Sequence, residues 1–460
     1  MSGCGFFSDN RIYRRTDVKN RKLHIIIVGA GASGLMAAIS AAQAGAHVTL
    51  LEQKEKTGKK ILATGNGHCN FTNDRMDVSC YHGNEFAMHV IKHFDVSQTL
   101  DFFRELGIFP HERNGYYYPM SEQAQAVADL LREKAEKLGV EILTERKVLS
   151  VTGRGKSGFQ VMVRTAVRES AGKNDGKNGE KDSKKDSKKG RGKAGNEKSG
   201  SVKNGKKKIL QEEIHYENQQ VYGDRVILAC GGRAYPALGS DGSGYELARS
   251  LGHHIVTPLP ALTGIRCQES WFRQLAGVRI SARVAILADG KCLASDTGEL
   301  QLTDYGISGI PVFQVSRYAA RALEERKKVQ AEITFFPELG DGELMEYLRT
   351  HAQEQYTGLY PAKLLEVLKQ LSKDGKLFHL TRHLLCTCLE INGFDRAQVT
   401  CGGVELTEVN ADTLESLLCP GVYLAGELLD VDGICGGYNL QWAWSSGWLA
   451  GKSAADHFPS

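Results

Sequence analysis

The first regular pattern of apolar and polar positions lies between residues 24 and 52. Residues 25–28 form an unbroken apolar run, typical of a strand buried on both faces. Small and apolar residues then continue over 34–44, and this favours a helix that stops at Gly45. A second apolar run covers 46–51. The pattern predicts a strand, a helix and a second strand, the order of a βαβ unit.

The turn between the first strand and the helix has the glycine spacing of a dinucleotide-binding loop. Gly29 permits a tight turn, Gly31 lets a pyrophosphate approach the backbone, and Gly34 lets the helix pack closely on the strand. Glu52 ends the second strand, near the offset expected for binding an adenosine ribose. A purely structural turn is the alternative, but the complete βαβ context favours a nucleotide. NAD, NADP and FAD all stay open.

The rest of the chain divides by the same patterns. Short strands and turns from 262 to 332 predict an antiparallel β-domain, whereas helical spacing from 341 to 389 predicts a small helical domain. The other predicted elements are helices at 85–106 and 123–138, a strand at 140–143, a meander at 148–151, 159–163 and 220–222, a buried strand at 224–229, and a closing strand, loop and helix at 420–451.

Two loops are candidates for ligand contact. The uncharged stretch 64–73 is rich in small residues and asparagine, which favours a backbone that passes close to a ligand over a plain solvent loop. Residues 426–441 combine acids and glycines before a helix, whose N-terminal amides would favour negative charge such as that of a reduced flavin ring. A structural C-terminal helix is the alternative for the second loop.

Length and composition restrict the class of protein. The 460 residues are enough for two or three domains. No apolar run approaches the ~20 residues of a membrane helix, and the basic first 22 residues lack the apolar core of a signal peptide. We therefore expect a cytoplasmic protein. The eleven cysteines lack the paired spacing of a zinc site or a disulfide framework, so we expect reduced thiols and no metal site.

The net charge of +4 is unevenly distributed. Residues 168–208 hold 15 Lys/Arg and 6 Asp/Glu, a surplus of +9, which leaves −5 for the rest of the chain. This segment has too few apolar residues to bury, so we expect a disordered surface insertion. It could tether an acidic partner such as RNA or a membrane surface, but we favour a tolerated loop expansion. We therefore expect a small-molecule substrate, no membrane insertion and no nucleic-acid partner.

Together these motifs resemble the BaiN/YhiN family of flavoproteins. Besides the opening loop, the matching stretches are Gly65–Asn73, Leu238–Tyr245, Tyr305–Gly309, Thr400–Val404, Ala425–Glu427 and Trp444–Gly447. The resemblance implies an α/β fold with a Rossmann-like FAD-binding domain built from both chain ends and two inserted domains. The implied division is a polar basic tail at 1–22, the FAD-binding domain at 23–258 and 395–460, an antiparallel β-domain at 259–335 and a helical domain at 336–394.

The resemblance also implies the residues that bind FAD. His68 stands where the family leads us to expect arginine, so no charge contact is carried over there. The residues carried over are Gly29, Ala30, Gly31, Ser33, Gly34, Glu52, Gln53, Lys60, Gly65, Asn66, Cys69, Asn70, Val148, Ala229, Gly231, Gly232, Gly426, Glu427, Asp430, Gly437, Tyr438, Asn439 and Leu440.

The activity that the resemblance implies is reduction of C=C bonds conjugated to the 3-keto group of bile-acid intermediates. NAD(P)H would dock transiently as electron donor, because the sequence shows no second cofactor domain. Tyr235, Tyr305 and Tyr438 are suitable proton donors, although a packing role is commoner for tyrosine, so the catalytic residue stays open. The alternatives are a flavin amine oxidase acting on aminoacetone-like substrates and an FAD-stabilised RNA-binding protein with residues 168–208 as its arm.

Overall fold

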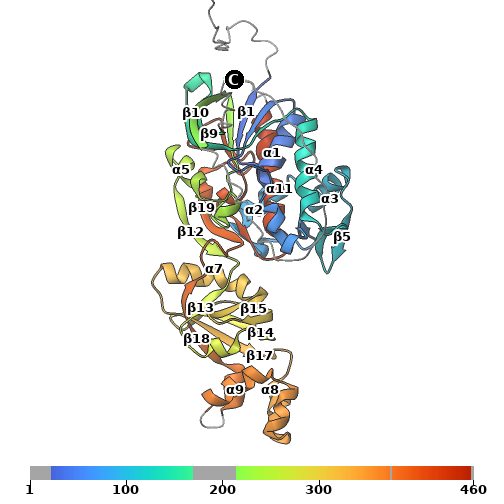
Figure 1. Ribbon diagram of the computed structural model, residues 1–460, viewed down its shortest axis with the longest axis vertical. Coiled ribbons are helices and arrows are strands. Elements are labelled where there is room, and N and C mark those ends of the chain that lie inside the picture. Colours follow the sequence, from blue (N-terminus) through green and yellow to red (C-terminus); the bar gives the residue numbers. More distant parts are fainter. Residues whose placement is uncertain (1–21, 169–213, 373–375, 457–460) are drawn as a thin grey trace, which may run out of the picture.

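The computed structural model describes residues 22–168, 214–372 and 376–456. Almost all of the basic tail and of the Lys-rich segment therefore lies outside the described residues. The described chain is elongated, with a part built on a parallel sheet at one end and a part built on a β-barrel at the other (Figure 1). None of its helices is long and apolar enough to span a membrane.

The first part is built on a five-stranded parallel sheet. Its central strand pairs on both sides, and its isoleucines are fully buried because the sheet is covered on both faces. The strand order is β20 (Val422–Leu424), β11 (Arg225–Leu228), β1 (His24–Val28), β2 (His47–Leu51) and β7 (Glu141–Leu143). The sheet therefore takes strands from both ends of the chain.

Two helices from opposite chain ends pack side by side in this part (Figure 1). They are α1 (Ala32–Gln43) and α11 (Tyr438–Ala455). A Cβ atom on Gly447 or Gly451 would lie 2.3 Å from the carbonyl oxygen of Ser33 or Ala37, respectively. Only glycine lets the two backbones approach so closely, so this contact fixes the C-terminal helix against the start of α1.

Smaller sheets and helices surround the parallel sheet. An antiparallel sheet contains β8 (Arg146–Gly153), β9 (Phe159–Arg168) and β10 (Ile214–Gly223), which agrees with the predicted meander. The remaining elements of this part are β3 (Thr72–Asn73), β4 (Tyr81–His82), β5 (Pro110–Arg113), β6 (Tyr116–Pro119), β21 (Asp432–Gly433), α2 (Asn84–Ile91), α3 (Val96–Glu105), α4 (Ala124–Lys137) and α5 (Ser243–Ser250).

The second part is a closed antiparallel barrel with its own apolar core. Buried and less buried side chains alternate along its strands, because successive residues point into and out of the barrel. The strands run in the order β13 (Ile265–Cys267), β16 (Gly306–Gly309), β15 (Lys291–Leu302), β14 (Arg279–Ala288), β17 (Val329–Phe335) and β18 (Leu384–Ile391). The helices packed around it are α6 (Phe272–Leu275), α7 (Ile310–Glu324), α8 (Asp341–Thr350), α9 (Ala362–Leu371) and α10 (Leu377–Arg382).

An antiparallel ribbon joins the two parts. It consists of β12 (Ile255–Ala261) and β19 (Val399–Val404). Helix α7 lies beside this junction (Figure 1), where the Gln314 side chain accepts a hydrogen bond from the Cys435 backbone N–H at 2.8 Å. The barrel is therefore held against the C-terminal loop of the first part.

The predicted fold class is confirmed, but two element predictions are wrong. The strand-rich region contains helix α7, which begins directly after Gly309 and carries Pro311 in its first turn, where proline is tolerated. The end of the predicted helical stretch is strand β18, in which Leu384, Cys386 and Cys388 are buried while Leu385 is exposed. This short apolar run fits helical spacing as well as strand alternation, and barrel pairing selects the strand. The proposed domain limits at 259, 335 and 395 stay predictions.

Candidate functional site

A cavity lies at the carboxyl ends of the central parallel strands. This is the edge where open α/β sheets bind their ligands. One wall, the cradle wall, comes from residues 28–33 and 51–53. A second set of lining residues, the assembled wall, comes from separate stretches of the chain and consists of Lys60, Ile61, Thr64, Gln398, Val399, Glu427, Val431, Asn439, Leu440, Trp442 and Ala443.

The cradle wall has room for a ligand directly at its backbone. Gly31 is the N-cap of helix α1, and a Cβ atom added there would meet nothing within 4 Å. A Cβ atom on Gly34 would instead lie 1.8 Å from the carbonyl oxygen of Gly29. Glycine is thus needed at the two positions for different reasons. Gly34 is required by packing, while Gly31 leaves open space at a helix N-terminus, where anionic groups bind.

Glu52 is fixed at the rim of the cradle wall. Its carboxylate accepts hydrogen bonds from the backbone N–H groups of Ala30 at 2.9 Å and Lys54 at 2.8 Å. Burial raises the pKa of Glu52, and these two hydrogen bonds oppose that shift. The next residue, Gln53, donates to the carbonyl oxygen of Gly239 at 2.5 Å. The carboxylate is therefore held in one place beside the loop that the glycines form.

An ion pair crosses the assembled wall. Lys60 Nζ lies 2.6 Å from Glu427 Oε2, and both side chains are partly buried. The other carboxylate oxygen of Glu427 accepts a hydrogen bond from the Thr400 backbone N–H at 2.7 Å. Residues from three distant stretches of the chain thus meet at this point. The Thr400 backbone positions Glu427, and Glu427 positions Lys60.

The start of helix α11 forms part of the same wall. Asn439 lines the cavity, and its side-chain amide both accepts from and donates to the backbone of Gly433, at 2.8 Å in each case. In the turn after strand β20, the Gly426 N–H donates to Ser446 Oγ at 3.0 Å, and the indole N–H of Trp442 donates to the Gly426 carbonyl at 2.9 Å. The positive end of an 18-residue helix is therefore fixed at the cavity.

A group of buried and partly buried charges joins the barrel to the loop that contains Val431. Arg317 of α7 lies 3.2 Å from Asp432, and Arg321 lies 3.5 Å from Asp430. Burial raises the pKa of Asp432 to about 6, against the attraction of the Arg317 guanidinium. Neither aspartate lines the cavity, whereas Val431 between them does.

The structure brings only part of the predicted set of cofactor residues to the cavity. Those that line it are Gly29, Ala30, Gly31, Ser33, Glu52, Gln53, Lys60, Val148, Ala229, Gly231, Glu427, Asn439 and Leu440. Those outside its lining are Gly34, Gly65, Asn66, Cys69, Asn70, Gly232, Gly426, Asp430, Gly437 and Tyr438.

The stretch after Thr64 turns away from the cavity. Thr64 itself lines it, but the Cys69 N–H donates back to the Thr64 carbonyl at 3.1 Å, and Cys69 is fully buried. Burial raises the pKa of the Cys69 thiol to about 12. The Asn70 side-chain amide donates to the carbonyl oxygens of Thr72 and Tyr117, at 2.9 and 3.2 Å. These contacts give the predicted loop a packing role in the described structure.

The three candidate tyrosines are dispersed, and none of them is among the described residues that line the cavity. Tyr438 packs edge-on against Tyr81, whose hydroxyl donates to the Tyr438 carbonyl at 2.8 Å. Tyr305 belongs to the barrel part and accepts a hydrogen bond from Asn392 at 3.1 Å. Tyr235 has a left-handed backbone with φ of 58° and precedes a short 3-10 turn.

Comparison with known proteins shows the family to which this chain belongs. The family model described as HI0933-like protein Rossmann domain matches residues 23–172 and 189–453. The chain belongs to the HI0933-like family. This membership confirms the resemblance drawn from the motifs of the sequence.

Relatives of this HI0933-like chain carry two different names. It is 43% identical over 456 residues to the 3-dehydro-bile acid delta(4,6)-reductase of Clostridium scindens, covering 94% of this chain and 98% of that protein. It is 27% identical over 450 residues to the ribosomal RNA dihydrouridine synthase of Escherichia coli, covering 93% and 96%. Among solved structures, a 3-ketosteroid-delta4-(5alpha)-dehydrogenase from Rhodococcus jostii matches with a TM-score of 0.45 at 14% identity, covering 96% and 99%.

Several lining residues of this family member were missed from the sequence. They are chiefly Lys56, Lys59, Arg146, Lys147, Cys230, Leu238, Ser240, Ser243, Gln398 and Val399. Ser240 and Ser243 belong to a stretch that carries the family resemblance, so that motif could have supplied them. Lys147, which pairs with Asp241 at 3.1 Å, precedes the predicted Val148. Gln398 and Val399 directly precede the Thr400–Val404 motif.

Proposed function

We propose that this chain is an FAD-dependent reductase of C=C bonds conjugated to a ketone, acting on a bile-acid or steroid-like ring system. The observation that carries the proposal is the 43% identity to a 3-dehydro-bile acid delta(4,6)-reductase over nearly the full length of both chains. A relative that is similar over one domain only would leave the inserted barrel unaccounted for; here the match includes it.

The residues at the cavity fit FAD. The open space at Gly31 on the N-terminus of α1 would take the pyrophosphate, and the fixed carboxylate of Glu52 would take the adenosine ribose. The assembled wall would face the flavin ring. The proposal keeps the predicted residues that line the cavity, and gives supporting roles to those outside it, such as Gly34 and Gly426.

Bound FAD would supply hydride transfer; the chain must place the substrate and stabilise charge. The fixed N-terminus of α11 would stabilise negative charge that develops nearby. Val399, Val431 and Leu440 offer an apolar lining that suits a steroid ring system. We also propose NAD(P)H as the electron donor; it would dock transiently beside the flavin.

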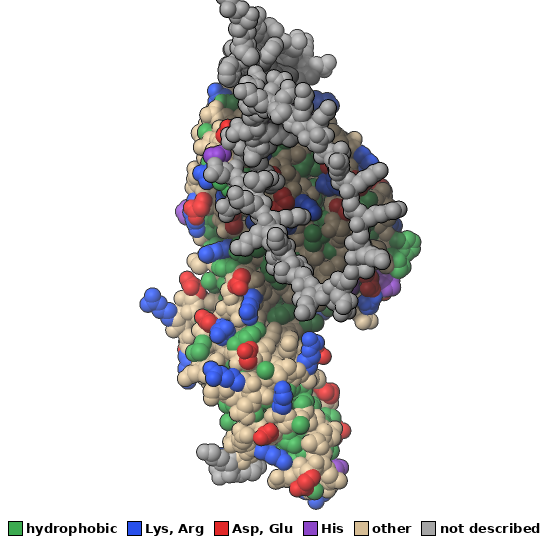
Figure 2. Space-filling model, in the orientation of Figure 1, with side chains coloured by type: hydrophobic (Ala, Val, Ile, Leu, Met, Phe, Trp, Pro, Cys, Tyr) green, Lys and Arg blue, Asp and Glu red, His purple; other side chains and the backbone are tan. Residues whose placement is uncertain are grey.

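A second candidate is reduction of uridine in ribosomal RNA. It is favoured by the 27% identity to a ribosomal RNA dihydrouridine synthase over 450 residues. Dihydrouridine is uridine with a saturated C=C bond next to a carbonyl group, so the chemistry is of the same class. The visible face of the barrel part carries interspersed acidic and basic side chains rather than a continuous basic patch (Figure 2). The bile-acid candidate is preferred because the chain is 43% identical to the bile-acid reductase and 27% identical to the RNA enzyme.

One anaerobic experiment separates the two candidates. The flavin of the purified protein is reduced with dithionite, and its reoxidation is followed after adding a Δ4,6-3-keto bile acid or an unmodified ribosomal RNA fragment. We expect the bile acid to accelerate reoxidation at least about a hundredfold over buffer, equivalent to about 2.7 kcal/mol, and the RNA to have no effect. Acceleration by RNA alone would replace the first candidate by the second. Separate reduction with NADH and NADPH tests the donor independently.

The contribution of residues 168–208 to RNA binding can be tested in the same assay. A chain lacking this Lys-rich segment should retain bile-acid reduction. If RNA is the substrate, deletion should weaken RNA binding and reduce its dependence on salt concentration, because fewer phosphate contacts release fewer counterions. Unchanged RNA affinity would show that the segment is not an RNA-binding arm.

A further inference from the structure

A cluster of two histidines and one aspartate lies on the surface, apart from the cavity. His89 and His93 are four residues apart at the end of helix α2, and Asp412 comes from a turn more than 300 residues later in the chain. One potential ligand atom from each residue lies within 4.8 Å of the other two. None of the three lines the cavity.

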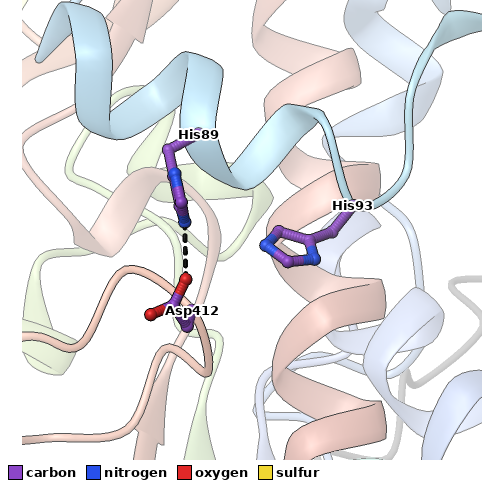
Figure 3. A group of neighbouring side chains, drawn as sticks. All are labelled: His89, His93 and Asp412. Carbon is purple, nitrogen blue, oxygen red and sulfur yellow. Dashed lines mark hydrogen bonds and ion pairs between the residues drawn. The ribbon is translucent and has the colours of Figure 1, made fainter.

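The three side chains converge on one point. His89 Nε2 lies 2.7 Å from Asp412 Oδ1. The His93 ring faces this pair from the side (Figure 3), with its centroid 5.5 Å from that of His89. A simple surface hydrogen bond accounts for His89 and Asp412, but it does not account for the third donor directed at the same place.

Backbone hydrogen bonds fix the two turns that carry His93 and Asp412. His93 continues the turn that ends α2, with its N–H donating to the Val90 carbonyl at 3.1 Å. On the other side, the Asp412 N–H donates to the Asn410 side chain at 2.8 Å, and the Leu414 N–H donates to the Asn410 carbonyl at 2.7 Å. His89 lies in the last turn of α2, whereas His93 lies in the turn that follows the helix, two residues after Ile91.

We propose that His89, His93 and Asp412 form a binding site for a divalent transition-metal ion, with Zn²⁺ as the preferred ion and water in the remaining coordination positions. Imidazole and carboxylate suit Zn²⁺, whose bonds to them are about 2.1 Å long, so two ligands in tetrahedral geometry lie about 3.4 Å apart. Separations of up to 4.8 Å must therefore close by up to about 1.4 Å, and the 2.7 Å contact between His89 and Asp412 must open, which rotation of these two exposed side chains can accommodate.

The ion would connect α2 to the turn that leads toward strand β20. The ion would have a structural role, cross-linking two segments of the folded chain, and would take no part in the reaction, since the cavity lies elsewhere. Lys452 is close enough to His93 to interact electrostatically and would repel a cation. Replacing this lysine by methionine should therefore tighten metal binding.

Isothermal titration of the flavin-loaded protein with Zn²⁺ tests the site. We expect one ion per chain, a melting temperature that rises with Zn²⁺ concentration, and at least a tenfold loss of affinity in each of His89→Ala, His93→Ala and Asp412→Asn. Lys452→Met should increase the affinity severalfold. The flavin content should be the same in all variants.

The chain offers a matched control. His379 and His383 are also four residues apart, with ring centroids 5.2 Å apart, and His383 pairs with Glu332 at 2.9 Å. This second group does not bring three ligand atoms together within 4.8 Å. His379→Ala should leave Zn²⁺ binding unchanged. Binding that survives His93→Ala, binding lost equally in His379→Ala, or no binding at all would overturn the proposal.

Discussion

The two walls of the cavity are made in different ways. In the cradle wall, residues 28–33 and 51–53 belong to one βαβ unit, so neighbouring residues in sequence are neighbours at the ligand. In the assembled wall, Lys60 meets Glu427, 367 residues later, and Glu427 is positioned in turn by Thr400. The first wall depends on local backbone geometry, and the second depends on contacts between distant segments.

This difference matters for how each wall tolerates change. A methyl group added at Gly34 would force the cradle apart, because the backbone atoms of Gly34 and Gly29 are already in contact. The assembled wall is supported by side chains and by the buried charges at the barrel junction, so its geometry is expected to respond to pH and to charge. The variants below test this contrast, beginning with the largest expected effect.

Gly34→Ala should disrupt the cradle wall most severely. The added Cβ atom would lie 1.8 Å from the Gly29 carbonyl oxygen and 3.4 Å from the Ala229 side chain. We expect the free energy of unfolding to fall by more than about 3 kcal/mol, because α1 must move away from β1, and the protein to purify without flavin. Chemical denaturation and the absorbance of bound flavin measure the two effects. Wild-type stability with full flavin content would contradict the close packing described for this turn.

Asp432→Asn should change the pH dependence of stability. Burial raises the folded-state pKa of Asp432 to about 6, above its ordinary value of 3.8. The native state therefore binds this proton more tightly than the unfolded state, so the stabilisation present below pH 4 is lost as the pH rises through 6. Relative to the variant, the wild type should lose about 3 kcal/mol of unfolding free energy between pH 3 and pH 7, most of it between pH 4 and pH 6.

Denaturation curves of both proteins at several pH values measure this difference. Parallel pH profiles for wild type and Asp432→Asn would show that the carboxylate does not titrate abnormally. A profile that diverges with the opposite sign would show that the attraction of Arg317 outweighs the burial of Asp432. The first result would remove the pH response expected of the assembled wall, and the second would reverse its direction.

The same contrast explains what could be predicted from the sequence. Gly29, Gly31 and Glu52 were found because glycine spacing and strand length place them without any knowledge of the rest of the fold. Glu427 and Asn439 lie in the 426–441 loop that the pattern of acids and glycines indicates, but only the family resemblance names them individually. Gln398 and Val399 were missed, because they reach the cavity through pairing of β19 with β12, which no local pattern encodes.

The fold shows the same limit. The parallel sheet follows from apolar runs that suit strands buried on both faces. Strand β18 was predicted as helix, since Leu384–Leu389 satisfies both periodicities and only the partners β13 and β17 decide between them. Closure of the barrel is a property of six strands together, and the sequence around any one of them does not predict it.

Gly31→Ser separates ligand binding from folding in the cradle wall. Serine is a good N-cap residue, and its side chain would enter space that is empty in the structure. The apoprotein should therefore keep its stability within about 0.5 kcal/mol. The affinity for FAD should fall at least tenfold, about 1.4 kcal/mol, because the hydroxymethyl group occupies the place of the pyrophosphate. Titration of apoprotein with FAD measures this; unchanged affinity would move the proposed pyrophosphate site away from Gly31.

The smallest effect is expected for the ion pair of the assembled wall. The free energies of unfolding of Lys60→Met, Glu427→Gln and the double variant, measured by chemical denaturation, form a double-mutant cycle. We expect a coupling free energy of about 1 kcal/mol, because the pair is partly buried and the Thr400 N–H fixes its carboxylate. The matched control is Lys137 with Glu133, an exposed pair 3.7 Å apart on helix α4, which should show a coupling below about 0.5 kcal/mol. Equal coupling in both cycles would mean that long-range positioning adds nothing to the Lys60 pair. A larger coupling at Lys60 alone would show that the distant segments hold its partner in place, and this is what distinguishes the assembled wall from the cradle.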